Sequence, residues 1–240
     1  MGNSMKAYKI YCVAITLTAL IFIAGFFTIF FHADYDSKVL VKLNLKEATI
    51  PVNHAVTAWS SCLEKLNYDS DVAFLGDSIT RGGDFQKYFE DIKVINLGYG
   101  GDIIKGVTNR LSMVKAVSPE KIFLLIGIND LTNYNVDMCA KSYSELLQKM
   151  KNNFPDTTIY VQSILPISKE KEKTKCFNST IEKLNKQIKS LCEEYKITYI
   201  DLYSVFSKDN QLNPELTKDG IHLKDEAYKV WTDAIRSYIA

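Results

Sequence analysis

Short apolar segments alternate with amphipathic stretches along the 240-residue chain from residue 71 onward. Five apolar segments have the length of buried strands, and they cover 71–75, 93–97, 121–126, 158–165 and 197–202. Four stretches carry apolar residues at helical spacing, and they cover 102–117, 136–153, 176–195 and 224–239. Such an alternation is typical of a parallel sheet with helices packed on both faces. The pattern therefore predicts an α/β domain with a mostly parallel, five-stranded sheet.

An uncharged apolar run at 10–31 precedes this domain. A helix with a rise of about 1.5 Å per residue spans, over this length, a hydrocarbon core of about 30 Å. Basic residues precede the run and acidic residues follow it, which places the N-terminus in the cytoplasm and the rest of the chain outside. These flanking residues are Lys6, Lys9, Asp34 and Asp36. We therefore expect a single-pass signal anchor and a periplasmic or extracellular domain.

A cleaved signal peptide is the alternative interpretation of the same run. The run is long for the apolar part of a signal peptide, and Phe31 stands where cleavage after Ala33 would prefer a small residue. We therefore favour the anchor and divide the chain into four parts. They are a cytoplasmic tail (1–9), a transmembrane anchor (10–31), a juxtamembrane stalk with a leading helix (32–66) and a globular domain (67–240).

The charge balance and the cysteine spacing argue against two kinds of ligand, nucleic acid and metal ions. The 29 basic and 28 acidic residues nearly balance, which gives no electrostatic basis for binding nucleic acid. Outside the anchor, which holds Cys12, the cysteines show no metal-ligand spacing, and we expect no metal or other cofactor. These cysteines are Cys62, Cys139, Cys176 and Cys192.

The even number of cysteines outside the anchor permits disulfides in an oxidising compartment, and reduced thiols in packed positions are the alternative. Cys139 follows the loop after the third strand, and Cys176 follows the loop after the fourth. One hypothesis is therefore that Cys139 and Cys176 pair above the strand ends.

Small and polar residues follow the predicted strands, at the ends where open α/β sheets bind ligands. The motifs are "GDSITRGGD" at the first strand, "NLGYGGD" at the second, "GINDL" at the third, and "KDGIHL" well beyond the fifth. Each motif alone is ordinary turn chemistry. Because the carboxyl ends of parallel strands meet at one edge of a sheet, the motifs together predict a site there.

The residue types in these motifs fit nucleophilic catalysis. A serine hydroxyl such as that of Ser78 is a weak nucleophile and needs a base beside it. Among the three histidines, His32 adjoins the anchor and His54 lies in the leading helix, which leaves His222 as the candidate base. Asp219, three residues before His222, can fix the tautomer of the imidazole and stabilise the imidazolium.

A tetrahedral oxyanion would also need hydrogen-bond donors. The candidates are the backbone N–H groups of Ser78 and Gly101 and the side-chain amide of Asn129, which follow three different strands. Gly101 suits a close approach of substrate to the backbone because it has no Cβ.

The four motifs, in this order, resemble those of the SGNH hydrolases, the GDSL-type esterase and lipase superfamily, over residues 71–240. The resemblance implies a flavodoxin-like three-layer αβα sandwich. It also implies that Ser78, His222 and Asp219 form a catalytic triad and that Ser78, Gly101 and Asn129 form an oxyanion hole. Ile79 replaces the leucine of the name motif, a change that conserves volume. The stretches "LGDSIT" and "GINDL", together with "DGIHL" followed by Ala-Tyr and Trp, are most similar to the acetylhydrolase-like branch, which acts on short acyl esters.

The loops after the strands indicate the kind of ester. They consist mostly of Asn, Asp, Lys, Thr and Gly, with Tyr99 and Tyr134 as the aromatic residues, and they offer no apolar groove for a long acyl chain. We therefore expect an acetyl-type ester of an extracytoplasmic carbohydrate as substrate. A lysophospholipid or other lipid, acyl transfer by the same triad, and an inactive binding module on this scaffold are the alternatives; an intact triad argues against the last.

Overall fold

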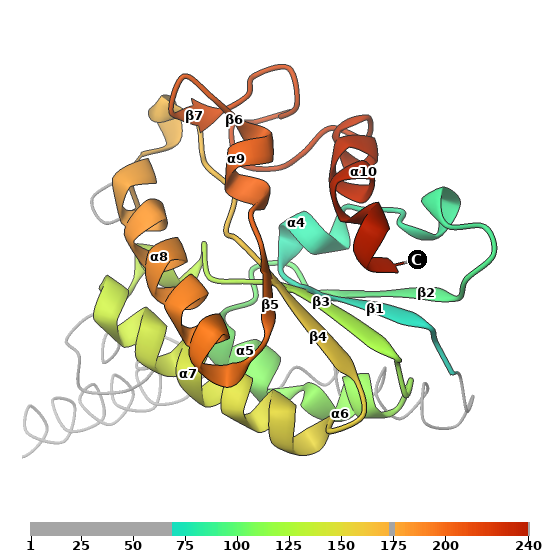
Figure 1. Ribbon diagram of the computed structural model, residues 1–240. Coiled ribbons are helices and arrows are strands. Elements are labelled where there is room, and N and C mark those ends of the chain that lie inside the picture. The colour runs from blue at the N-terminus through green and yellow to red at the C-terminus, as the bar shows by residue number, and fades with distance from the viewer. Residues whose placement is uncertain (1–68, 173–175, 240) are drawn as a thin grey trace, which may run out of the picture. The chain divides into compact units, whose positions relative to one another are not determined.

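The central sheet contains five parallel strands in the order β2-β1-β3-β4-β5 (Figure 1). The computed structural model describes residues 69–172 and 176–239. The strands are β1 (Val72–Gly76), β2 (Val94–Gly98), β3 (Lys121–Leu125), β4 (Thr158–Gln162) and β5 (Thr198–Ile200). All five lie within or overlap the predicted apolar segments, so the predicted parallel sheet is confirmed. This order is that of flavodoxin-like folds, and its topological switch point lies between β1 and β3.

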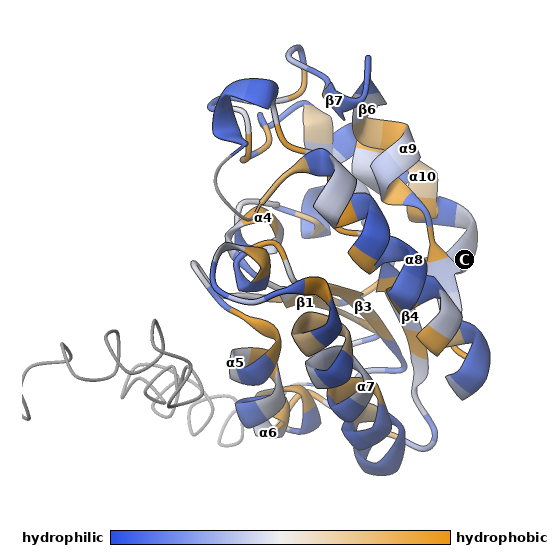
Figure 2. Ribbon diagram, turned by 90° about the vertical axis from the view of Figure 1, so that its left-hand side faces the viewer, coloured by the Kyte–Doolittle hydropathy of each residue, from blue (hydrophilic) through white to orange (hydrophobic). Residues whose placement is uncertain are grey.

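Helices cover both faces of the sheet, which confirms the three-layer αβα arrangement (Figure 1). Figure 2 shows the apolar strands between helices whose outward surfaces are largely hydrophilic. One layer contains α5 (Ile104–Asn109), α6 (Leu111–Lys115), α7 (Val136–Asn153) and α8 (Asn178–Tyr195). The other contains α4 (Ser78–Arg81), α9 (Leu202–Phe206) and α10 (Ala227–Ile239).

The core explains why β1 can be apolar at every position. All five of its residues are buried, because helices cover both faces of this central strand. Phe74 of β1 stacks on Phe85 with ring centroids 3.7 Å apart, and Phe85 meets Trp231 of α10 edge to face at 5.3 Å. These ring contacts link β1, the segment after α4 and α10.

Two predicted elements have different lengths from those expected. The segment 158–165 is a strand only as far as Gln162, and the following residues remain buried. The N–H of Ser163 still donates to the carbonyl of Ile200 in β5 at 2.9 Å, but beyond it side chains hold the backbone. Asn185 of α8 both donates to the carbonyl of Ile164 and accepts from its N–H, each at 2.9 Å. Asn178 makes the same pair of bonds with Ile167, each at 2.8 Å. These two asparagines therefore satisfy backbone groups that a longer strand would pair with its neighbour, and the carbonyl of Ile167 also accepts from the N–H of Leu212 at 3.2 Å.

The predicted helix over 102–117 is interrupted. It forms two short helices, α5 and α6, that meet at Arg110, whose φ of −113° and ψ of 22° are not helical. Arg110 is buried, and its guanidinium turns towards the sheet and binds backbone carbonyls there. The break therefore accompanies a buried cation that the helical pattern alone does not reveal.

A small hairpin, which the sequence pattern did not predict, connects α9 to the loop that carries Asp219. It consists of β6 (Ser207–Lys208) and β7 (Gln211–Leu212), which pair antiparallel. Asp209 and Asn210 form its two-residue turn with φ values of 53° and 56°. Two consecutive left-handed residues define the turn type that matches the twist of paired strands.

The proposed disulfide between Cys139 and Cys176 is wrong. Both are free thiols in the structure, as is Cys192, and all three are buried among apolar side chains. Burial raises the pKa of Cys139 and of Cys192 to about 12 and that of Cys176 to about 11. For these three residues the alternative of reduced, packed thiols holds, whereas Cys62 lies outside the described residues.

The membrane prediction concerns residues beyond those described. Within 69–172 and 176–239, no helix combines the length and apolar character needed to cross a bilayer. The predicted tail, anchor, stalk and leading helix, which together cover 1–66, lie outside the described residues.

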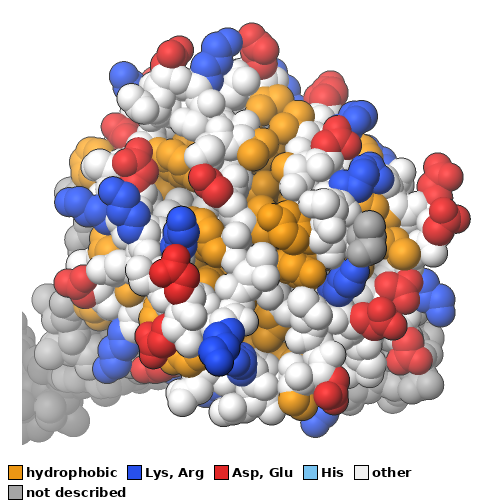
Figure 3. Space-filling model, viewed as in Figure 1, with side chains coloured by type: hydrophobic (Ala, Val, Ile, Leu, Met, Phe, Trp, Pro, Cys, Tyr) orange, Lys and Arg blue, Asp and Glu red, His pale blue; other side chains and the backbone are white. Residues whose placement is uncertain are grey.

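On the face seen in Figure 3, basic and acidic side chains are interspersed around small apolar areas.

Candidate active site

Ser78 begins α4 directly beyond the carboxyl end of β1, beside the topological switch point. The turn into the helix is tight, because a Cβ on Gly76 would lie 2.2 Å from Oγ1 of Thr80 and 2.3 Å from the carbonyl oxygen of Leu125. Asp77 caps the helix, and its Oδ1 accepts a 2.9 Å hydrogen bond from the N–H of Ile79. This geometry leaves Ser78 half-buried at the edge of the sheet where the strands have their carboxyl ends.

The structure brings together the three residues predicted to form the triad. Oγ of Ser78 lies 3.0 Å from Nε2 of His222, although 144 positions separate them in the chain. Nδ1 of His222 lies 2.7 Å from Oδ2 of Asp219. The side chains of His222 and Asp219 are 36% and 43% exposed, so solvent and substrate can reach the pair. The three side chains form one continuous hydrogen-bonded chain.

Asp219 is held as an anion. Its partial desolvation favours the neutral form, but hydrogen bonds from the His222 side chain and from the N–H groups of His222 and Ile221 outweigh this and lower its pKa to about 2. An ionised carboxylate only accepts, so Nδ1 of His222 carries the proton that points to Asp219. Nε2 is therefore the nitrogen that can take the proton of Ser78.

The loop that carries Asp219 and His222 is fixed at both sides. Oγ1 of Thr217 donates to the carbonyl of His222 at 2.7 Å and accepts from the N–H of Gly220 at 2.8 Å. The carbonyl of Gly220 accepts at 2.9 Å from the N–H of Ser168, at the end of the segment held by Asn178. The segment after β4 thus supports the loop of the candidate base.

The candidate oxyanion donors follow β1, β2 and β3 as predicted. Gly101 has a φ of +75° and is the third residue of a turn closed by a 3.2 Å bond from the N–H of Asp102 to the carbonyl of Tyr99. Nothing lies within 4 Å of the place where a Cβ on Gly101 would stand, so open space adjoins this residue. Nδ2 of Asn129 donates to the carbonyl of Asp102 at 2.8 Å, and its second hydrogen is not used by that bond.

Arg110 binds the backbone next to these donors, a role that the sequence pattern did not predict. Its Nη1 donates to the carbonyl of Leu97 at 2.7 Å and its Nη2 to the carbonyl of Gly76 at 2.9 Å. Its Nε donates at 2.7 Å to Asp102, which accepts the Asn129 amide through its backbone carbonyl. Arg110 and Asp102 are both almost fully buried, with 4% and 2% of their side chains exposed. One guanidinium therefore connects the ends of β1 and β2 to the turn that contains Gly101.

Two further aspartates in the motifs are structural. Asp77 caps α4, and both carboxylate oxygens of Asp130 lie 3.1–3.2 Å from the N–H of Ile104, the first residue of α5. Burial is the main reason that the pKa of each is raised from 3.8 to about 7. Neither touches the triad in any hydrogen bond of the described residues.

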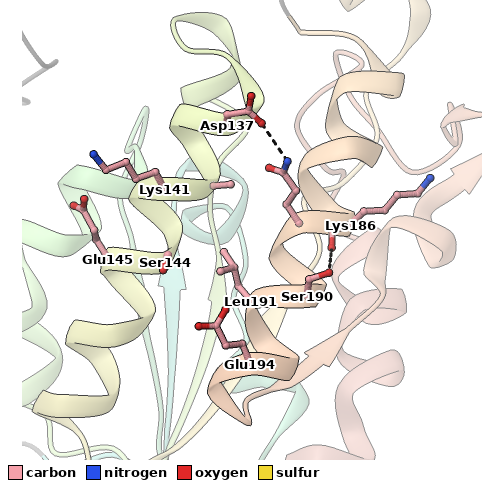
Figure 4. Close-up of a pocket in the computed structure, with 10 residues that line it drawn as sticks. Asp137, Lys141, Ser144, Glu145, Lys186, Ser190, Leu191 and Glu194 are labelled. Carbon is pink, nitrogen blue, oxygen red and sulfur yellow. Dashed lines mark hydrogen bonds between the residues drawn. The ribbon is translucent and has the colours of Figure 1, made fainter.

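A separate hollow of about 640 Å³ lies between α7 and α8 (Figure 4). Gln187 and Asp137 approach across it, with a 3.3 Å hydrogen bond from Nε2 to Oδ1. Its lining includes no residue of the triad or of the candidate oxyanion hole, so it is not part of this site. Within the described residues, no group of three or more His, Cys, Asp or Glu side chains could hold a metal ion.

The chain also matches a known protein family. The model of the GDSL-like Lipase/Acylhydrolase family matches residues 74–230. The chain therefore belongs to this family, the SGNH hydrolases. A putative acylhydrolase from Bacteroides fragilis has a similar structure, with a TM-score of 0.68 and 25% identity, over 80% of this chain and 97% of that one.

Two curated relatives are longer proteins. An N-acylneuraminate cytidylyltransferase of Streptococcus agalactiae serotype V is 25% identical over 179 residues, which cover 71% of this chain and 41% of that protein. A multidomain esterase of Ruminococcus flavefaciens is 27% identical over 133 residues, which cover 52% of this chain and 17% of that protein. The chain thus spans less than half the length of either relative.

Proposed function

We propose that this protein hydrolyses short acyl esters through a covalent acyl-enzyme on Ser78. His222 takes the proton of the Ser78 hydroxyl as Oγ attacks the ester carbonyl, and Asp219 stabilises the imidazolium that forms. The N–H groups of Ser78 and Gly101 and the amide of Asn129 donate to the oxyanion. His222 then gives its proton to the departing alcohol. The observation that carries this proposal is the continuous hydrogen-bonded chain from Ser78 through His222 to Asp219.

The second half of the cycle uses the same groups. Water attacks the acyl carbon while Nε2 of His222 accepts its proton, and the tetrahedral intermediate releases the carboxylic acid as Oγ of Ser78 recovers a proton from His222. The exposure of His222 and Asp219 gives this water a route to the acyl-enzyme.

We infer that the substrate is an acetyl-type ester of a carbohydrate outside the cytoplasm, with the protein held at the membrane by residues 10–31. Polar loops at the strand ends support a hydroxyl-rich leaving group over a lipid tail. One relative is named for a sugar acid, N-acylneuraminate, and another is named an esterase, which supports the same substrate class.

A series of p-nitrophenyl esters of increasing chain length, with the full-length chain, tests this proposal. We expect kcat/KM to be highest for acetyl and to fall beyond about four carbons, because no groove repays the burial of further methylene groups at about 0.8 kcal/mol each. A rise of kcat/KM through eight carbons or more would support a lipase instead. No turnover of any ester above the background of Ser78→Ala would contradict the proposed hydrolysis.

A further inference from the structure

Arg81 is an exposed cation on the same short helix as Ser78, three residues further along the chain. Residues at this spacing lie on the same side of a helix. Within 69–172 and 176–239, no hydrogen bond or ion pair engages its guanidinium. The other two arginines of this part of the chain are engaged, since Arg110 binds Asp102 and two carbonyls while Arg236 lies 3.6 Å from Asp233 and over the ring of Phe89.

The position of the Arg81 guanidinium is set by two glycines of the loop after β2. At Gly98, a Cβ would stand 2.2 Å from the backbone nitrogen of Arg81, so the end of α4 packs directly on the end of β2. At Gly100, a Cβ would stand 2.9 Å from Nη1 and 3.3 Å from Cζ of Arg81. The guanidinium therefore lies against Gly100, which directly precedes the candidate oxyanion donor Gly101.

The surroundings of the Arg81 guanidinium leave room for an anionic ligand. Open space adjoins Gly101, where nothing lies within 4 Å of a virtual Cβ. Asp77, Asp102 and Asp130 are buried and hydrogen-bonded to other groups. Asp84, at the end of the first motif, is exposed. A guanidinium presents a planar fork that binds a carboxylate through two parallel hydrogen bonds.

We propose that Arg81 forms an anion-recognition subsite beside the oxyanion hole and that the substrate is an O-acylated sugar that carries a carboxylate. This inference rests on the proposed esterase function and adds the charge of the substrate to it. Binding places the carboxylate of the sugar against the guanidinium and the ester between Ser78 and Gly101. A lysophospholipid also carries an anion, but the polar strand-end loops favour the sugar acid.

Two acetyl esters that differ in one charge provide the test. They are O-acetylated N-acetylneuraminate and the same compound with its carboxylate converted to a carboxamide, and p-nitrophenyl acetate reports the chemistry without a sugar. The full-length chain is compared with Arg81→Gln, Arg81→Lys and the matched control Arg236→Gln, which removes an exposed guanidinium from α10. Circular dichroism and thermal melting of each variant check that it is folded.

We expect the wild type to prefer the carboxylate over the carboxamide by about tenfold or more in kcat/KM, the size of one charge-assisted interaction. Arg81→Gln should abolish this preference and leave the rates on the carboxamide and on p-nitrophenyl acetate within about twofold of wild type. Arg81→Lys should retain part of the preference, because a lysine keeps the charge without the fork. Arg236→Gln should behave as wild type.

Three outcomes would overturn the inference: no preference of the wild type for the carboxylate, an equal loss on all three substrates in Arg81→Gln, or Arg81-dependent cleavage of a lysophospholipid but not of the sugar acid. Failure of the proposed function is distinguishable from these, because the wild type would then also leave p-nitrophenyl acetate intact.

Discussion

The hydroxyl of Tyr228 on α10 donates a 2.7 Å hydrogen bond to the carbonyl of Ile79, the residue that follows Ser78. This buried contact spans 149 positions of the chain and connects the last helix to the helix of the candidate nucleophile. A Cβ on Gly82, at the end of α4, would lie 2.4 Å from the same hydroxyl. Tyr228 thus helps to fix where α4 stands above the sheet.

Tyr228→Phe removes this hydrogen bond and keeps the ring. We expect a loss of about 1 kcal/mol in the free energy of unfolding, the ordinary net contribution of a buried hydrogen bond. Activity should fall mainly through kcat, because Ser78 loses alignment while the surface that binds substrate is unchanged. Urea unfolding and steady-state kinetics on p-nitrophenyl acetate measure the two effects, and wild-type values for both would show that Tyr228 does not position α4.

Asn129→Ala tests the side-chain member of the oxyanion hole. We expect kcat to fall by about 10²- to 10³-fold with little change in KM, because the amide acts on charge that develops in the transition state. Asn129→Asp is the matched variant of the same shape, which replaces the donor amide with an acceptor, and it should lose at least as much. A rate unchanged by both substitutions would exclude Asn129 from the hole.

Asp102→Asn tests the buried ion pair between Asp102 and Arg110. The guanidinium of Arg110 would remain buried without its counter-charge, and breaking such a pair costs about 3–5 kcal/mol of stability. We also expect a lower kcat, because the same guanidinium holds the ends of β1 and β2 next to the oxyanion donors. Lys229→Gln, which removes one partner of the exposed pair with Asp233, is the control and should change stability by less than about 1 kcal/mol. Equal effects of the two substitutions would contradict this assignment.

The buried carboxyl groups of Asp77 and Asp130 should make the stability of the folded protein depend on pH. The pKa of each is raised from 3.8 to about 7 in the folded protein, so the folded state holds more protons than the unfolded state between these values. Their contribution therefore decreases stability as the pH rises from about 4 to about 7 and is constant above that. Asp77→Asn keeps a side-chain oxygen for the helix cap and removes the titration. Melting temperatures measured from pH 5 to pH 8 should fall less steeply in this variant, and an unchanged slope would contradict the assignment.

Local sequence patterns were sufficient to predict the positions of the strands and the bounds of the helix α7. The helix predicted over 136–153 coincides with α7, where the side chain of Asn135 accepts from the N–H of Met138 and marks the start of the helix. The triad residues were also predictable, because Ser78 follows β1 in the motif "GDSIT", and His222 and Asp219 stand three residues apart in the motif "DGIH".

The parts that were missed depend on contacts between segments distant in sequence. Arg110 stands in an amphipathic stretch, and its burial and the break in the helix are explained by its bonds to the carbonyls of Gly76 and Leu97 and to Asp102. An apolar run after Gln162 looks like a continued strand, because apolar patterning does not distinguish pairing with a strand from the reciprocal bonds of Asn178 and Asn185. The cysteine pairing failed for a related reason, since loop order does not specify where each thiol packs.

The central claim is that Ser78, activated by His222, carries the acyl group during turnover. The most direct measurement is intact-mass and peptide analysis of the full-length chain, quenched with acid during turnover of p-nitrophenyl acetate. The account predicts a single acetyl group on the peptide that contains Ser78 in the wild type, and no acetylation above background in Ser78→Ala or His222→Ala. An acetyl group that forms at the same rate in Ser78→Ala, or wild-type turnover by that variant, would contradict it.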